Sequence, residues 1–199
     1  LIAGVLASVS CATLSAFVVW RGMAFAGDAM AHSILPGIVL AYVLGFSLFL
    51  GALAAAVVAV FGIGMITRHG RLREDTAIGV MFAGLFSLGI LLLSRVATFQ
   101  DLSHVLFGNI LGVSRNDLIA MLVVVLVVVA AVSLFFKELL VTSFDPAHAV
   151  AIGLSPEVIR YGLLAALALT TVVAVQTVGV VLVLALLVTP AAAASMLSR

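Results

Sequence analysis

The residues of this sequence whose types and spacing suggest chemistry are Asp28 and His32, in the stretch GDAMAHSILPG. Side chains four residues apart lie one turn from each other on the same face of a helix. A carboxylate oxygen and an imidazole nitrogen are ligands that zinc, manganese and ferrous iron all accept, so the pair could form half of a metal site. The same pair could instead relay protons. A third interpretation is structural: Asp28 would cap a helix and His32 would pack between helices.

The composition around this pair is that of a membrane protein. Of the 199 residues, 65% are hydrophobic and only 9% are charged, whereas soluble domains carry about 25% charged residues. Such a chain lacks the charged surface of a soluble enzyme or a nucleic-acid-binding protein, so we expect no nucleic-acid partner and a lipid bilayer as surroundings. The single cysteine, Cys11, excludes both a disulfide framework and a cysteine metal cluster.

The hydrophobic runs between charged residues predict seven membrane spans. A helix of about 20 residues crosses a bilayer, and three runs fit one span each: 1–20, 77–94 and 118–136. Two longer runs fit two spans each: 161–198, and 22–66, in which Asp28 is the only ionised residue. Glycine and polar residues place the two bends near Gly45 and Gly179. The predicted fold is therefore all-α, a polytopic transmembrane helical bundle of about seven spans.

This span count places Asp28 and His32 inside the membrane. A carboxylate at the middle of a bilayer costs about 2.5–3.5 kcal/mol, so Asp28 should face a polar cavity or bind an ion. Pro36 has no backbone N–H, and it should kink the span one turn after His32. Pro190 could bend the last span in the same way.

The distribution of basic residues predicts which side of the membrane each loop occupies. Short loops rich in Lys and Arg stay in the cytoplasm. Seven alternating spans put seven basic residues on one side (Arg21, Arg68, Arg71, Arg73, Lys137, Arg160 and Arg199) and two on the other (Arg95 and Arg115). The first side should therefore be cytoplasmic, in a multi-pass protein of the cell inner (cytoplasmic) membrane whose residue 1 lies outside.

The predicted external segment, 95–117, is too apolar for a solvated loop and too short in its apolar part to cross the membrane. It should lie in the interface or re-enter the bilayer. Ser114 and Asp117 form the pattern of a capping box that would start the next span. Asp101 and His104 could give a metal ion its first contact at the outer mouth, or they could be an ordinary exposed pair.

The predicted cytoplasmic segment between the fifth and sixth spans contains a short helix. Asp145 suits the N-cap, Pro146 suits the first helical position and Gly153 suits the C-terminal stop, which delimits about two turns. Ala149 is a small residue that would allow a partner to approach closely. From the residues alone, this helix could dock with a partner or could be a connector that touches only lipid headgroups.

Four stretches, in this order, resemble successive blocks of the manganese/zinc/iron permease family of bacterial ABC importers: RGMAFAGDAMAHSILPG, LFGNILGVSRNDL, FDPAHAVAIGL and VGVVLVLALLVTPAAAASML. The resemblance implies a homodimeric membrane subunit that works with a cytoplasmic ATP-binding subunit and an extracytoplasmic metal-binding protein. It implies transport of a divalent ion (Zn, Mn or Fe), no permanently bound cofactor and no enzymatic activity of the chain itself. Residues 1–199 would be a single permease domain, and because family members are longer, we expect a fragment lacking a short N-terminal piece and at least one C-terminal span.

The resemblance also suggests roles for individual residues. Asp28 and His32 match the GDxxxH stretch of the family, which implies that they line the ion path. The helix from Asp145 to Gly153 falls where the family has its coupling helix, which implies docking with the ATP-binding subunit. His104 departs from the family, in which an aromatic residue is expected, so it is left out of the primary site.

Two other functions fit parts of the sequence. A stand-alone, proton-coupled secondary transporter could use Asp28 and His32 as its relay, although such transporters often show inverted repeats and none is convincing here. An intramembrane metalloprotease would need a pattern such as HExxH, which is missing from the sequence. The sequence also has no P-loop, so ATP hydrolysis would have to come from a partner.

Overall fold

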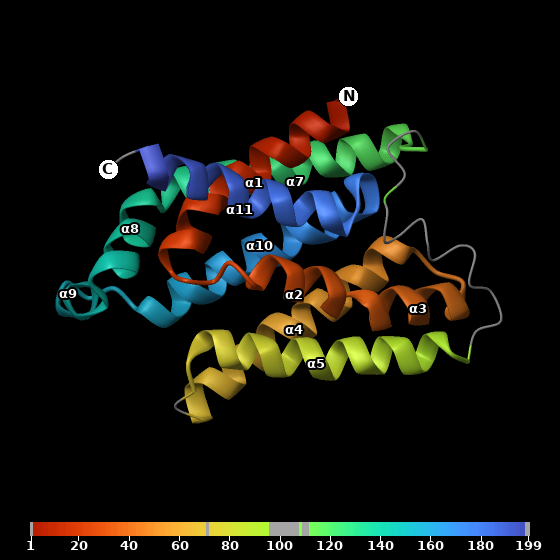
Figure 1. The fold of residues 1–199 in the computed structure, drawn as a ribbon, viewed down its shortest axis with the longest axis horizontal. Coiled ribbons are helices and arrows are strands. Elements are labelled where there is room, and N and C mark those ends of the chain that lie inside the picture. Colours follow the sequence, from red (N-terminus) through yellow and green to blue (C-terminus); the bar gives the residue numbers. More distant parts are fainter. Residues whose placement is uncertain (1, 71, 96–107, 109–111, 198–199) are drawn as a thin grey trace.

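The structure, a computed structural model, describes residues 2–70, 72–95, 108 and 112–197 (Figure 1). Its regular elements in these ranges are α-helices: α1 (Ile2–Trp20), α2 (Ala26–Ser33), α3 (Leu35–Leu44), α4 (Leu48–Gly70), α5 (Glu74–Leu93), α7 (Arg115–Leu134), α8 (Phe136–Phe144), α9 (Pro146–Ala151), α10 (Pro156–Val178) and α11 (Val180–Leu197). The prediction of an all-α protein is confirmed. Asp101 and His104 lie outside the described residues.

The predicted number of spans is also confirmed for the described part of the chain. Seven helical segments are long and apolar enough to cross a membrane: α1, α2 with α3, α4, α5, α7, α10 and α11. The bends fall where glycine allows them, because α3 ends before Gly45 (φ +73°) and α10 ends before Gly179 (φ +83°). A left-handed φ at Gly45 is accessible to glycine at little cost, and this residue closes α3.

The second span is divided into two helices close to the predicted kink. α2 ends at Ser33 and α3 begins at Leu35, with Pro36 in its first turn. Proline interrupts a continuous helix because it has no N–H and its ring collides with the preceding turn. Pro190 behaves differently, since α11 continues on both sides of it. The next N–H, that of Ala191, donates to the Ser15 hydroxyl oxygen on α1 at 3.1 Å.

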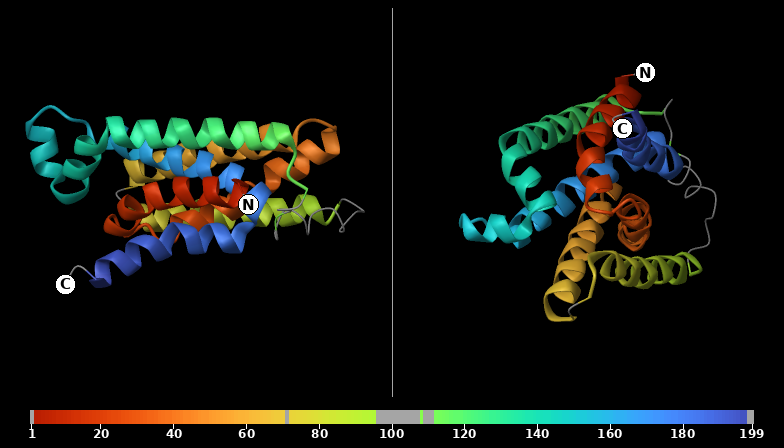
Figure 2. Two further views of the ribbon diagram at one scale, coloured as in Figure 1. Left: turned by 90° about the horizontal axis from the view of Figure 1, so that it is seen from above. Right: turned by 60° about the vertical axis from the view of Figure 1, so that its left-hand side comes forward.

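The helices form one bundle, in which α10 contacts α1, α2, α4 and α7 (Figures 1 and 2). α2 packs against α5, α10 and α11. Gly37 on α3 and Gly51 on α4 lie so close together that a Cβ on either residue would overlap the backbone oxygen of the other. Small residues allow membrane helices to pack through van der Waals contact of their backbones.

The short helices α8 and α9 lie at one end of the bundle, the same end as the connection between α4 and α5 (Figure 1). The start of α1 lies toward the opposite end. The predicted sidedness therefore agrees with the arrangement of these segments, because Arg21, the α4–α5 connection and the α8–α9 pair were all assigned to one side. Which side faces the cytoplasm remains a prediction.

Candidate metal site

Asp28 and His32 meet on one face of α2, as their spacing predicts. The Asp28 Oδ1 and His32 Nε2 atoms are 3.5 Å apart. Two ligands of one tetrahedral ion, each bound at about 2.0–2.2 Å, lie about 3.4 Å from each other. The side chains of Asp28 and His32 are 27% and 25% exposed, so their polar atoms are within reach of a small cation. The pair thus has the separation and the access that an ion would need.

The structure does not support a role for Asp28 as a helix cap. The N-cap position of α2 is Phe25, which makes no side-chain cap bond, and Asp28 lies inside the first turn. A negative charge in this turn is favoured by the positive end of the helix dipole. Asp28 therefore lies where the helix dipole stabilises its charge, but it is not the N-cap residue of α2.

Two phenylalanines of α5 hold the His32 ring. The His32 ring centroid lies 5.1 Å from that of Phe86 and 5.8 Å from that of Phe82, in both cases edge to face. Phe82 and Phe86 are themselves stacked, 5.6 Å apart, and Phe25 packs against Phe82 at 5.5 Å. The sequence did not predict a role for these phenylalanines. Their i, i+4 spacing was a weak signal, because it shows that they share a face of α5 but not what that face touches.

The pair does not belong to a closed cluster of strong metal ligands. Among the described residues, no group of three or more His, Cys, Asp or Glu side chains could hold a metal ion. Other groups, such as water or backbone oxygens, would complete the coordination of an ion at Asp28 and His32. An ion held by few protein ligands can leave, which a transport path requires and a structural metal site does not.

The predicted short helix is present as α9, with the expected ends. The Asp145 carboxylate accepts a hydrogen bond from the His148 N–H at 2.9 Å, and Pro146 is in the first turn. Gly153 has φ +83°, and the N–H of Leu154 donates to the Ala149 carbonyl oxygen at 2.9 Å. This i+5 bond and the left-handed glycine are those of a Schellman motif, which ends the helix.

Ala149, which we expected to allow a partner to approach closely, lies on the inner side of α9. Ala149 is 0% exposed, because it is on the side of α9 that packs against the rest of the chain. A partner would instead meet the exposed apolar side chains at this end, namely Phe144, Val150 and Ile152. The reason is geometric: successive residues of a helix point about 100° apart, so the sequence shows that Ala149 is small without showing which way it points.

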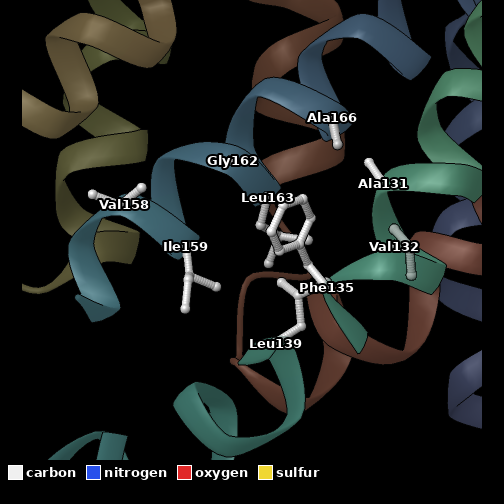
Figure 3. A pocket seen from close by; sticks show the side chains of 9 residues that line it. All are labelled: Ala131, Val132, Phe135, Leu139, Val158, Ile159, Gly162, Leu163 and Ala166. Atoms are coloured by element: carbon white, nitrogen blue, oxygen red, sulfur yellow. The ribbon is translucent and has the colours of Figure 1, made fainter. Parts of the chain in front are cut away.

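An apolar hollow of about 240 Å³ lies between α7, α8 and α10 (Figure 3). It is lined by Ala131, Val132, Phe135, Leu139, Val158, Ile159, Gly162, Leu163 and Ala166. A second hollow, of about 410 Å³, lies between α4, α7 and α10 and is equally apolar. A divalent cation finds no side-chain ligand in either hollow. Neither hollow includes Asp28 or His32, so the candidate ion site is separate from both.

Comparison with known proteins relates the whole chain to metal transporters. A family model described as the ABC 3 transport family matches residues 1–199. The "Manganese transport system membrane protein MntC" of Listeria monocytogenes is 42% identical over 199 residues, which are all of this chain and 71% of that protein. The "Chelated iron transport system membrane protein YfeD" of Yersinia pestis is also 42% identical, over all of this chain and 67% of that protein.

A solved structure has the same arrangement of helices. The chain matches one in "PsaBC from Streptococcus pneumoniae in complex with Fab" with a TM-score of 0.83 and 36% sequence identity, over 98% of this chain and 70% of that one. The match covers every span described above. The chain therefore belongs to the ABC 3 transport family, as a permease of the metal ABC importers.

Proposed function

We propose that this chain is the membrane-spanning permease subunit of an ABC importer that moves a divalent transition-metal ion into the cytoplasm. The observation that carries the proposal is the 3.5 Å separation of Asp28 Oδ1 and His32 Nε2 on a partly exposed face within a membrane span. Membership of the family supports it, as do relatives whose names specify manganese or iron. Oxygen and nitrogen ligands also accept zinc, so the metal is Mn, Fe or Zn.

In this proposal, Asp28 and His32 contact the ion directly as it passes. The Asp28 carboxylate offsets part of the cost of removing a divalent cation from water. The His32 ring contributes a lone pair at Nε2, and its edge-to-face packing with Phe82 and Phe86 restricts how the ring can turn. The site binds the ion and releases it, because two protein ligands from one helix leave the remaining positions to exchangeable groups.

The energy comes from another subunit, which we place at the α9 end. A cytoplasmic ATP-binding subunit docks on α9, and ATP hydrolysis there drives the movement of the spans. An extracytoplasmic metal-binding protein delivers the ion at the opposite end, and a second copy of the chain completes a homodimer in the cell inner membrane. Residues 1–199 act as one permease domain, without enzymatic activity or a permanent cofactor of their own.

A stand-alone secondary transporter, with Asp28 and His32 as a proton relay, is the weaker proposal, because the family to which the chain belongs is an ABC transport family. Uptake into proteoliposomes separates the two. We expect the permease, reconstituted with its ATP-binding subunit, to accumulate manganese(II) only when ATP can be hydrolysed. Uptake that follows a pH gradient and is indifferent to ATP would contradict the ABC mechanism.

A further inference from the structure

The Arg21 side chain joins two parts of the chain that are far apart in sequence. Its Nε donates to Ser143 Oγ at 3.0 Å and its Nη2 donates to Thr142 Oγ1 at 2.7 Å. Thr142 and Ser143 are in the last turn of α8, and only Phe144 and Asp145 separate them from α9. Arg21 therefore contacts the segment that leads directly into the short helix at this end of the bundle.

The hydroxyl oxygens of Thr142 and Ser143 act as acceptors of the hydrogen bonds from Arg21. Thr142 Oγ1 donates to the Glu138 carbonyl oxygen at 2.8 Å, and Ser143 Oγ donates to the Leu139 carbonyl oxygen at 2.6 Å. A hydroxyl has a single proton, so these bonds leave its oxygen only as an acceptor. The planar guanidinium can hold both oxygens at once, in a fixed direction that a lysine ammonium would not impose.

The backbone that follows Arg21 is hydrogen-bonded to both α1 and α2. Arg21 follows the last residue of α1, and Gly22 (φ +69°) donates its N–H to the Val19 carbonyl oxygen at 3.0 Å. The N–H of Met23 donates to the Val18 carbonyl oxygen at 2.9 Å, which completes a Schellman motif. Met23 is buried, and its carbonyl oxygen accepts from the N–H of Ala26, the first residue of α2.

Charged groups extend this link to α5 and α10. Glu74, the first residue of α5, has its Oε1 atom 3.9 Å from the Arg160 Nε atom on α10. Burial lowers the pKa of Arg21 from its usual value, and the nearby Glu74 carboxylate opposes this shift. Arginine nevertheless stays charged in proteins. Glu74 therefore connects these charged groups to α5, the helix that also carries Phe82 and Phe86.

We propose that Arg21 is a positioning residue that transmits movement of the α8–α9 pair to α2 and α5, and thereby to the face that holds Asp28 and His32. The inference rests on the proposed function, which makes α9 the docking point of the ATP-binding subunit. Arg21 does not touch the ion. Its hydrogen bonds connect the end of α8, which moves with α9 in this proposal, to the turn that leads from α1 into α2.

The test measures the number of manganese(II) ions transported per ATP hydrolysed by the reconstituted complex. The variants are Arg21→Gln and, on the other side of the same bonds, Thr142→Val combined with Ser143→Ala. Arg68→Gln is the matched control, because Arg68 is an exposed arginine in the last turn of α4. The end of α4 lies at the same end of the bundle as α8 and α9 (Figure 1). We expect both test variants to lower the ions per ATP by at least about threefold while the KM for manganese stays within about twofold, as a change in coupling energy would do.

A merely structural role would lower the amount of folded complex and would leave the ratio of ions to ATP unchanged. If Arg21→Gln does not reach the membrane, the double variant Thr142→Val, Ser143→Ala tests the proposal instead. A wild-type ratio in that variant would overturn the link through α8, and so would a ratio that falls equally in Arg68→Gln. Failure of the proposed function is distinguishable, because the unsubstituted complex itself would then show no ATP-driven uptake.

Discussion

Pro36 lies four residues after His32 and cannot give the His32 carbonyl oxygen its helical hydrogen bond, so this oxygen accepts instead from the Ile34 N–H. This hydrogen bond lies at the C-terminal end of α2, directly after His32. α3 then starts anew and packs against α4 through Gly37 and Gly51. The helix that carries the candidate site is thus a short element of its own, separate from α3 within the same span.

Asp28→Asn should reduce manganese uptake by at least about tenfold, because it removes the charge that compensates a divalent ion while it preserves the size of the side chain. The measurement is uptake of radioactive manganese, normalised to permease in the membrane. Asparagine caps helices about as well as aspartate, so a cap would tolerate the change. Wild-type transport by Asp28→Asn would exclude a role for this carboxylate in the ion path.

His32→Ala should impair uptake as well, and its combination with Asp28→Asn should be little worse than the worse single variant. Two groups that serve one ion act as a unit, and their effects are not additive. The comparison needs the two single variants and the double variant in the same membrane preparation. Losses that multiply would show that Asp28 and His32 act independently.

Phe86→Ala should weaken transport without removing a ligand, because the His32 ring loses the nearer of its two aromatic contacts. Such a contact contributes about 0.5–1.5 kcal/mol, so the KM for manganese should rise by about two- to tenfold. Phe61→Ala is the matched control, since Phe61 is an exposed phenylalanine on α4. A KM for Phe86→Ala equal to that of the control would show that the ring does not orient His32.

Val150→Asp should weaken binding of the ATP-binding subunit by at least about tenfold, because a carboxylate would be buried without a partner at the docked surface. Val150 is 62% exposed on α9, so the free permease should tolerate the change. Co-purification in detergent measures it, with Leu72→Asp as the control at an exposed apolar residue between α4 and α5. Equal recovery of the ATP-binding subunit with both variants would place the docking surface elsewhere.

Single cysteines at positions 68 and 115 should react from opposite sides of the membrane. The change Cys11→Ser removes the only native thiol, and Arg68→Cys and Arg115→Cys then introduce one thiol each at exposed positions. From the seven-to-two distribution of basic residues, we expect an impermeant thiol reagent to label position 115 in intact cells and position 68 only after permeabilisation. Labelling of both positions from outside would refute the topology.

The sequence by itself determined the features that depend on local chemistry. The length of the apolar runs sets the seven spans, Gly45 and Gly179 mark the bends, and Pro36 breaks the second span near the predicted kink. The ends of α9 follow from Asp145 and Gly153 in the same way. The i, i+4 spacing of Asp28 and His32 is likewise a property of one helix, and this is why the sequence could predict that they meet.

The tertiary structure alone decided which surfaces meet across the bundle. It places Phe86 of α5 against His32, turns Ala149 inward and brings Arg21 to Thr142, which is 121 residues further along the chain. Nearly all the spans are apolar around their whole circumference, so hydrophobic periodicity does not distinguish the face toward lipid from the face toward a neighbouring helix. Close packing of small and large side chains makes that distinction, and it depends on the whole bundle rather than on any one segment.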